Sequence, residues 1–579
     1  MRVRGSEAFV ESLRLEGVST VFGINGSAIV DPLDLFTAAG IDFIQVRNEQ
    51  NAGGMADGYT QASGKITVCI GQNGPGITNL VSGVAMAYAN HTPMIVVTPS
   101  VTTMQSGSHI VQEVDQMALL SGVTVFQHKV ARADRIPWAM RAAFRSALIK
   151  RGPAQVDIPR DLFYDELDWD EQAPASYRHS GLTQPAQSDI DAAVELLATA
   201  RRPLIVCGLG VAQTEAFPQV GQLADLVDAG VTTIYNHNDA FDNSHPRYVG
   251  PLGYSGSKFA MEHSSHADVV LALGTRLNPT GTSPQYDVDF WPADARLILN
   301  DADPLNIGAN HPIDVGLVGD CALTVDALVS ALESRGIAPD RETATVSAIA
   351  EGKNAWWRTL SDEASGPASV LSPKAALLRL AELTPNNAIV TADAGNATSF
   401  VTTYFEFTRG RSLMMPGTFG SMGGAFANAI GAKVAAPERP VIAISGDGAW
   451  GTGLQEVLTA VAEDAPVISV VLNNGSLAAE RANQLGFLGG RFYACDLDNP
   501  DFAAIAELMG ATGITVRTLE ELEIAYTNAL ASSKPVVLDV HVDVEVLAPP
   551  RRKDALQSRE RLHPRYARDA KAQSETSYE

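Results

Sequence analysis

The chain has 579 residues, with 42 lysine and arginine residues against 66 aspartate and glutamate residues, which gives a formal net charge of −24. A chain this acidic lacks the basic face that nucleic acid or an anionic membrane surface requires, so we expect neither partner. Apolar residues make up 45% of the sequence, which is typical of a globular protein with real hydrophobic cores.

Short apolar runs with β-forming residues alternate with amphipathic stretches from the N-terminus onward. The first residues contain no apolar signal segment, and a helix is predicted over Ser6–Leu15. Buried strands are predicted at Val18–Ile24, Ile66–Ile70 and Met94–Thr98, with helical patterns between them. This alternation is typical of βαβ units on a parallel sheet.

The same alternation continues in two further blocks, so the predicted fold class is α/β with three doubly wound parallel-sheet domains. The expected domains are 1–165, 188–335 and 370–546, followed by a polar tail over 547–579 that is a candidate lid. No apolar run approaches the roughly 18 residues of a membrane span. The cysteines form no paired motif that would suggest a disulfide framework or zinc site, which favours a cytoplasmic location. They are Cys69, Cys207, Cys321 and Cys495.

Two polar turns in the third block carry the clearest chemical signal. Gly446-Asp447-Gly448-Ala449 directly follows the predicted strand Val441–Ser445, and Asn473-Asn474 directly follows the strand Val467–Leu472. Either turn alone would be an ordinary loop. Because the carboxyl ends of parallel strands form the ligand-binding edge of a sheet, the side chains of Asp447 and Asn474 are expected to converge there. Carboxylate and amide oxygens suit Mg²⁺, and glycine turns admit phosphate groups.

Together these motifs resemble the diphosphate and magnesium signature of thiamine diphosphate (ThDP) enzymes. The likeness extends to the acetolactate-synthase-like branch through Asn48-Glu49-Gln50-Asn51-Ala52-Gly53, Gly74-Pro75-Gly76-Ile77-Thr78-Asn79 and Gln112-Glu113-Val114-Asp115-Gln116. The resemblance implies three domains in the order pyrimidine-binding, central and diphosphate-binding. It also implies ThDP and Mg²⁺ as cofactors.

The resemblance further assigns roles to individual residues. Glu49 would hydrogen-bond N1′ of the aminopyrimidine, and Gln112 and His91 are the other catalytic candidates. Asp447, Asn474 and the carbonyl of Ser476 would bind Mg²⁺. The residues expected around ThDP are Glu49, Pro75, Asn79, Gly395, Asn396, Gly420, Met422, Gly446, Asp447, Gly448, Ala449, Asn474, Ser476 and Leu477.

Stretches of the central block, such as His237-Asn238-Asp239-Ala240-Phe241, resemble the sulfoacetaldehyde acetyltransferases within this family. That resemblance implies conversion of sulfoacetaldehyde and phosphate to acetyl phosphate and sulfite, with the acetyl group carried on ThDP. Both substrates are anions, which multi-donor or cationic groups would bind. The candidates for this contact are Asn73, Arg276, Arg481, Arg551 and Arg552.

Differences from that subfamily cluster near the expected pocket and leave other interpretations open. Asn48 stands where a histidine is usual, and Leu477 stands where a tryptophan is expected. The alternative is another ThDP-dependent carboligase, decarboxylase or 2-hydroxyacyl-CoA lyase that acts on a 2-oxo acid, an aldehyde or an acyl-CoA. A regulatory subunit without turnover is less consistent with the joint presence of Glu49, Asp447 and Asn474. The family also implies a homodimer or homotetramer with active sites at subunit interfaces.

Overall fold

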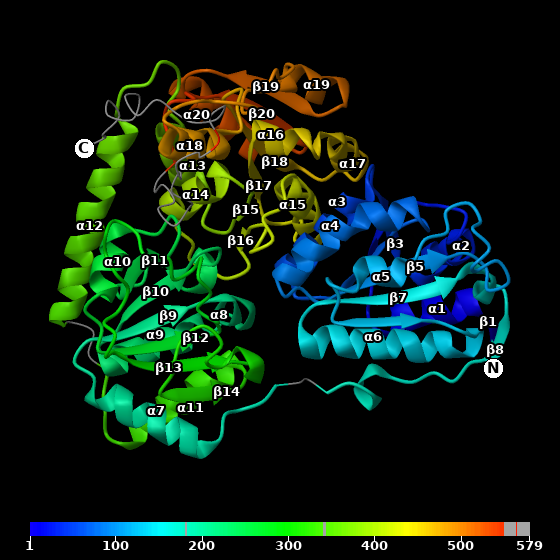
Figure 1. Cartoon of the computed structure of the whole chain (residues 1–579), viewed down its shortest axis with the longest axis horizontal. Coiled ribbons are helices and arrows are strands. Elements are labelled where there is room, and N and C mark those ends of the chain that lie inside the picture. Colours follow the sequence, from blue (N-terminus) through cyan, green and yellow to red (C-terminus); the bar gives the residue numbers. More distant parts are fainter. Residues whose placement is uncertain (180–181, 340–342, 549–562, 564–579) are drawn as a thin grey trace.

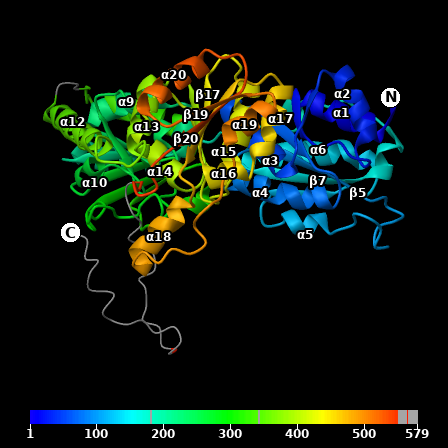
Figure 2. The same cartoon turned by 90° about the horizontal axis from the view of Figure 1, so that it is seen from above.

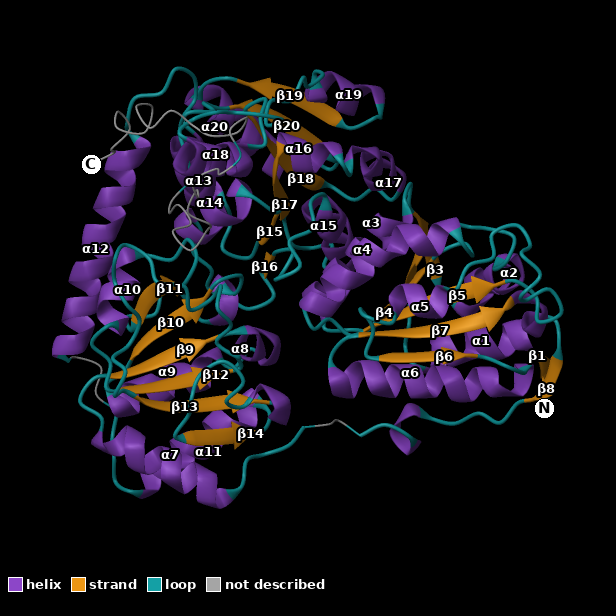
Figure 3. Ribbon diagram, viewed as in Figure 1, coloured by secondary structure: helices purple, strands orange, loops and turns teal. Residues whose placement is uncertain are grey.

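Each of the three predicted blocks contains one six-stranded sheet in which all neighbouring strands run parallel (Figure 1). The computed structural model describes residues 1–179, 182–339, 343–548 and 563. Helices flank the sheets, as Figure 3 shows, and the strands are buried runs rich in Val, Ile and Leu. This arrangement confirms the predicted α/β class with three parallel-sheet domains.

The first sheet has its hydrophobic core on both faces, and a short antiparallel pair of β1 (Arg2–Arg4) and β8 (Glu166–Asp168) lies beside it. Its strands, in spatial order, are β3 (Asp42–Gln45), β2 (Thr20–Gly23), β4 (Thr67–Ile70), β5 (Met94–Ser100), β7 (Pro153–Pro159) and β6 (Phe126–Lys129). Its helices are α1 (Gly5–Leu15), α2 (Val30–Ala39), α3 (Glu49–Ser63), α4 (Pro75–Ala89), α5 (Gln116–Leu120) and α6 (Ile136–Lys150).

The second sheet lies in the central part of the chain and is joined to the third by the long helix α12 (Ala344–Ala364), at the left of Figure 1. Its strands, in spatial order, are β11 (Tyr248–Leu252), β10 (Gly230–Ile234), β9 (Pro203–Cys207), β12 (Val269–Leu273), β13 (Arg296–Asp301) and β14 (Val315–Val318). Its other helices are α7 (Gln187–Thr199), α8 (Leu209–Thr214), α9 (Phe217–Val227), α10 (Lys258–Ser264) and α11 (Cys321–Ser334).

The third sheet carries both polar turns identified from the sequence. Its strands, in spatial order, are β16 (Leu413–Met414), β15 (Ile389–Ala392), β17 (Val441–Gly446), β18 (Val467–Asn473), β20 (Val536–His541) and β19 (Thr512–Val516). Its helices are α13 (Pro373–Leu383), α14 (Asn396–Tyr404), α15 (Gly424–Ala435), α16 (Asp447–Gly451), α17 (Val457–Ala462), α18 (Ala478–Leu488), α19 (Phe502–Leu508) and α20 (Leu519–Leu530).

Helix α3 of the first sheet packs directly on helix α15 of the third sheet (Figure 1). Glycines make this close approach possible: a β-carbon at Gly58 would lie 2.1 Å from the backbone oxygen of Asn428, and one at Gly431 would lie 1.9 Å from the oxygen of Met55. Buried Asp57 accepts a hydrogen bond of 3.0 Å from Asn428 Nδ2 across the same contact. The first and third domains of one chain are therefore joined by backbone contact as well as by side chains.

The central domain is tied to the third by a buried carboxylate. Asp239 Oδ2 accepts hydrogen bonds from the backbone N–H groups of Ser412 (2.9 Å) and Leu413 (3.1 Å), at the start of edge strand β16. Burial raises the pKa of Asp239 to about 6. Across the described residues, no helix is both long enough and apolar enough to cross a membrane.

Candidate functional site

The turns after β17 and β18 meet at one edge of the third sheet. Asp447 begins α16, is almost fully buried, and accepts a hydrogen bond of 2.7 Å from the backbone N–H of Gly475, which lies in the turn after β18. Strands β17 and β18 are in register up to Gly446 and Leu472, so both chains turn at the same level. Burial raises the pKa of Asp447. The convergence expected from the sequence spacing is thus present in the backbone.

Oxygen atoms dominate this meeting point. Asn474 Oδ1 accepts from the backbone N–H of Ser476 at 3.1 Å, which closes the turn after β18, and Ser476 is itself buried. The described residues contain no cluster of three or more His, Cys, Asp or Glu side chains able to hold a metal. The carboxylate of Asp447, the amide oxygen of Asn474 and the backbone carbonyl of Ser476 are the ligand types that suit a hard cation such as Mg²⁺.

Glycine turns surround the same edge. Gly446 has open space where a side chain would be, and Gly395 (φ +102°) and Gly420 (φ +71°) adopt backbone conformations that favour glycine. Met422 is 40% exposed and therefore free to contact a ligand or a second chain. Leu477 faces Gly448, where a β-carbon would lie 2.6 Å from Leu477 Cδ2. Ala449 and Asn396 are the remaining predicted residues here, in α16 and at the start of α14.

Two further residues shape this edge, and sequence reasoning placed Asp393 in its loop but missed Asn499. Asp393, directly after β15, accepts from the backbone N–H groups of Gly423 (2.9 Å) and Ala425 (3.3 Å) and so fixes the turn that follows Met422. Burial raises its pKa to about 6. Asn499 donates to Asp447 Oδ2 at 2.9 Å. Like Asp447, Asp393 directly follows a predicted strand, which is a feature that the sequence shows. Asn499 has no such feature in its neighbouring sequence.

The second group of predicted residues gathers at the start of helices α3 and α4. Glu49 is 6% exposed, and its Oε2 accepts a hydrogen bond of 3.0 Å from Asn79 Nδ2. A β-carbon at Gly76 would lie 2.7 Å from Glu49 Oε1, so any other residue there would require the Glu49 side chain to shift. Pro75 occupies the first turn of α4, where its missing N–H costs nothing. Glu49 is therefore almost fully buried and hydrogen-bonded to the amide of Asn79.

The neighbouring loop brings Asn73 and Gln112 to the same place. Asn73 Nδ2 donates to the backbone oxygen of Gln112 at 3.4 Å, and Gln72 Nε2 donates to Gln112 Oε1 at 3.1 Å. Gln112 has φ +66°, and Gly74 packs against its backbone oxygen. Buried Gln116 accepts a hydrogen bond of 2.9 Å from the backbone N–H of Gly74 and so fixes the loop that precedes α4. Asn73, Gln112, Pro75, Asn79 and Glu49 thus form one cluster.

His91 and Arg276 lie elsewhere in this chain. His91 follows the C-terminal end of α4, and Glu49 faces its N-terminal end, about 22 Å away along a 15-residue helix. The His91 ring and Arg276 approach each other to 3.4 Å between the first and central domains. Burial, together with the nearby Arg276 charge, lowers the pKa of His91. The structure does not bring these two residues to the Glu49 cluster.

Arg481 is already engaged within its own domain. It lies on α18, which has no buried residue and projects from the third domain (Figure 2). Its guanidinium bonds Glu545 at 2.8 Å and stacks over the Phe492 ring at 3.8 Å. Arg551 and Arg552 lie outside the described residues.

Sequence comparisons agree with the three sheets. Residues 3–119 match the thiamine pyrophosphate enzyme N-terminal TPP binding domain, residues 190–328 its central domain, and residues 393–540 its C-terminal TPP binding domain. A sulfoacetaldehyde acetyltransferase of Alcaligenes xylosoxydans xylosoxydans is 40% identical over 587 residues, which covers 97% of this chain and 96% of the relative. The chain belongs to the thiamine pyrophosphate enzyme family.

Other relatives of this ThDP enzyme carry two different names. A sulfoacetaldehyde acetyltransferase of Castellaniella defragrans is 39% identical over 582 residues, covering 97% of this chain and 96% of the relative. A probable acetolactate synthase large subunit of Methanocaldococcus jannaschii is 32% identical over 551 residues, covering 93% of this chain and 92% of the relative. Both groups span nearly the whole chain, so the likeness includes the central domain.

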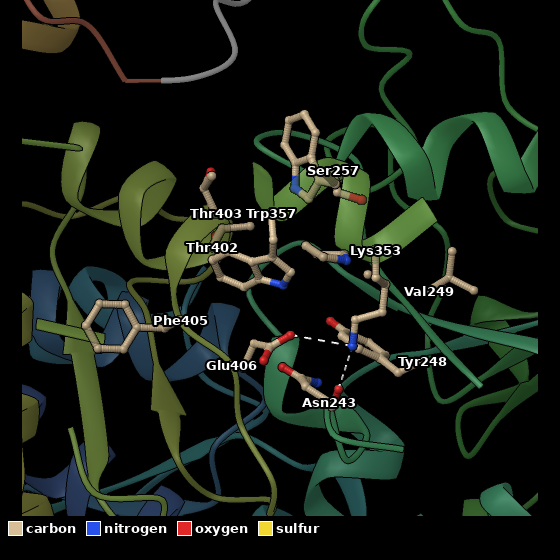
Figure 4. Close-up of a pocket in the computed structure, with 13 residues that line it drawn as sticks. Asn243, Tyr248, Val249, Ser257, Lys353, Trp357, Thr402, Thr403, Phe405 and Glu406 are labelled. Atoms are coloured by element: carbon tan, nitrogen blue, oxygen red, sulfur yellow. Dashed lines mark hydrogen bonds and ion pairs between the residues drawn. The ribbon is translucent and has the colours of Figure 1, made fainter. Parts of the chain in front are cut away.

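A cavity in the described part of this ThDP enzyme has a lining separate from both clusters. It lies between β11, α12 and the end of α14, and Figure 4 shows Lys353 pointing toward Glu406 and Asn243. Lys353 Nζ donates to the Asn243 backbone oxygen at 2.9 Å and lies 5.1 Å from the centre of the Tyr248 ring. Its residues include none that the sequence assigned to the cofactor or substrate.

Proposed function

We propose that this ThDP enzyme is a Mg²⁺-dependent acetyltransferase that converts sulfoacetaldehyde and phosphate to acetyl phosphate and sulfite. The observation that carries the proposal is that five relatives named sulfoacetaldehyde acetyltransferase, one of them as probable, match 96–97% of the chain at 36–40% identity. Relatives named acetolactate synthase match at 29–32%. A ThDP enzyme acting on a 2-oxo acid is therefore the second candidate.

ThDP supplies a carbon nucleophile that can hold an acyl group, and the protein binds, orients and manages protons. Asp447, Asn474 and the carbonyl of Ser476 would hold Mg²⁺, which in turn would bind the diphosphate. Gly446, Gly448 and Gly395 would let the backbone approach the phosphate oxygens. The support for this assignment is the all-oxygen donor set and the open space at Gly446.

Glu49 would act at the other end of the cofactor by holding a proton at N1′ of the aminopyrimidine. Its support is the burial of Glu49 beside the amide of Asn79, because a buried carboxylate is stabilised when a ligand group forms a further hydrogen bond with it. Asn73 and Gln112 offer uncharged donors near this group and are our first candidates for the anionic substrate. To bind the substrate, Arg276 would have to give up its contact with His91, and Arg481 its ion pair with Glu545.

We further propose the domain limits 1–165, 188–335 and 370–546, and a homodimer or homotetramer in which one chain's Glu49 serves the cofactor held by another chain's Asp447. Met422 is 40% exposed and Phe419 is 50% exposed. These neighbouring exposed apolar side chains support a partner chain at this edge, because such surfaces commonly mark interaction sites.

The test is one incubation of the purified protein with ThDP, Mg²⁺ and sulfoacetaldehyde, with and without phosphate. Release of both sulfite and acetyl phosphate, dependent on phosphate, is expected. Glu49→Gln should abolish it, while Glu463→Gln, the same change at an exposed glutamate, should not. Bound ThDP without sulfite release would refute the substrate and direct attention to pyruvate and 2-hydroxyacyl thioesters.

A further inference from the structure

A buried carboxylate of the third domain reaches across to the residues just before Glu49. Glu456 closes the short 3₁₀ turn Leu454–Glu456 that follows α16, and it has no solvent exposure. Its Oε1 accepts from the backbone N–H groups of Arg47 (3.1 Å) and Asn48 (3.0 Å). The same carboxylate also accepts from Asn51 Nδ2 at 2.9 Å and Thr459 Oγ1 at 2.7 Å.

The position of these donors sets what Glu456 can do. Asn48 is the N-cap residue of α3, and Glu49 is the first residue of that helix. N–H groups at a helix start have no partner inside the helix, and a negative charge there is favoured by the helix dipole. Glu456 therefore fixes the backbone that leads into Glu49. It lies nine residues after Asp447, so the same part of the third domain carries Asp447 and contacts the start of α3.

Stability alone is a weak reason for this arrangement. Burial raises the pKa of Glu456, which means that ionisation carries a desolvation cost, and all the partners named above are neutral groups. A buried charge with neutral partners commonly contributes little net stability compared with apolar packing. It does define one geometry, because its oxygens must satisfy several donors at once.

We propose that Glu456 is a positioning residue for Glu49: it holds the start of α3 so that the Glu49 carboxylate meets N1′ of the aminopyrimidine at hydrogen-bonding distance. This inference rests on the proposed roles of Glu49 and ThDP, but not on the identity of the aldehyde. It predicts that loss of the Glu456 carboxylate slows proton removal from the cofactor more than it weakens cofactor binding.

The experiment compares Glu456→Gln with Glu463→Gln, a matched change at an exposed glutamate farther along the same chain segment. Two quantities are measured without any acyl substrate: the ThDP dissociation constant, and the rate at which the C2 proton of bound ThDP exchanges with deuterium. A shift of the order of 1 Å at a reacting group can cost about 100-fold in rate, so we expect Glu456→Gln to slow C2 exchange at least about tenfold. We expect its ThDP affinity to change by less than about threefold, because the Mg²⁺ and diphosphate contacts remain.

Amide hydrogen exchange of the cofactor-free protein provides an independent check. The backbone N–H groups of Arg47 and Asn48 should lose protection in Glu456→Gln, because the glutamine amide turns an N–H₂ group toward one of its former donors. If Glu456→Gln loses amide protection at Arg47 and Asn48 but exchanges the C2 proton at the wild-type rate, the proposal is overturned. Glu456 would then only join the two domains structurally.

If Glu456→Gln does not fold, Thr459→Val carries the same test. It removes one hydrogen bond to Glu456 Oε2 while keeping the carboxylate and the α3 contacts. C2 exchange slowed about two- to fivefold supports the proposal, and an unchanged rate refutes it. Rapid C2 exchange in the wild type with no sulfite formed from sulfoacetaldehyde would refute the substrate assignment alone.

Discussion

The contact between α3 and α15 is so close that one added methyl group should separate the domains. In Gly58→Ala the new β-carbon would lie 2.1 Å from Asn428 O, and real β-carbons essentially never approach below 3.0 Å, so the helices must move apart by 3.0 − 2.1 = 0.9 Å. The obstacle is backbone and cannot rotate away. Overpacking of this kind costs about 1–3 kcal/mol. The 3.0 Å bond from Asn428 Nδ2 to Asp57 would stretch as well, and losing a bond to a carboxylate costs about 1.5–3 kcal/mol.

Against these costs, alanine favours a helix over glycine by about 1 kcal/mol, so the net loss should be about 1.5–5 kcal/mol. Thermal and urea unfolding of the cofactor-free protein would measure it. The control is Gly486→Ala in helix α18, where no atom lies within 4 Å of the added β-carbon and the change should be neutral or slightly stabilising. A Gly58→Ala protein as stable as Gly486→Ala would refute the argument that backbone contact joins the two domains.

Three further predictions concern the site and its surroundings. Co-expressing the inactive variants Glu49→Gln and Asp447→Asn should restore turnover, because a mixed dimer keeps one intact site if each site takes these residues from different chains; no recovery would place both on one cofactor within a chain. Asp447→Asn alone should weaken ThDP binding about 100-fold at fixed Mg²⁺ in a calorimetric titration, and unchanged affinity would exclude a metal role. Asp239 has a pKa of about 6 in the folded chain against an unfolded value of 3.8, so its stabilising contribution is complete below about pH 4 and is lost as the pH rises through 6. The stability of Asp239→Asn relative to the wild type should therefore increase from pH 4 to pH 7, and a flat difference in unfolding free energy would contradict the raised pKa.

The sheets could be predicted because their information is local. Runs such as Val467–Leu472 are mostly β-branched and apolar, and such a run indicates a strand buried on both faces wherever it lies in the chain. The meeting of Asp447 with the turn around Asn474 could also be predicted, since two adjacent parallel strands must end at the same edge.

Contacts between distant segments left no comparable signal. Glu456 and Arg47 are 409 positions apart, and no periodicity in either segment indicates that a helix start in the first domain completes its hydrogen bonds in the third. Asp239 reaches Ser412 across 173 positions in the same way. The contact of His91 with Arg276 is of the same kind: the two residues are 185 positions apart, and neither segment signals the other.

The α3–α15 contact also has a consequence for synthesis of the chain. Asp57 and Asn428 are 371 positions apart. At a synthesis rate of about 5–20 residues per second, helix α15 is therefore made roughly 20–70 s after the glycine-containing face of α3 that it covers. During that time the first domain can form its own sheet, because strands β2 to β7 need nothing beyond Pro159. The nascent protein therefore carries an uncovered helix face through most of its translation, and a chaperone that binds it would act until the third domain emerges.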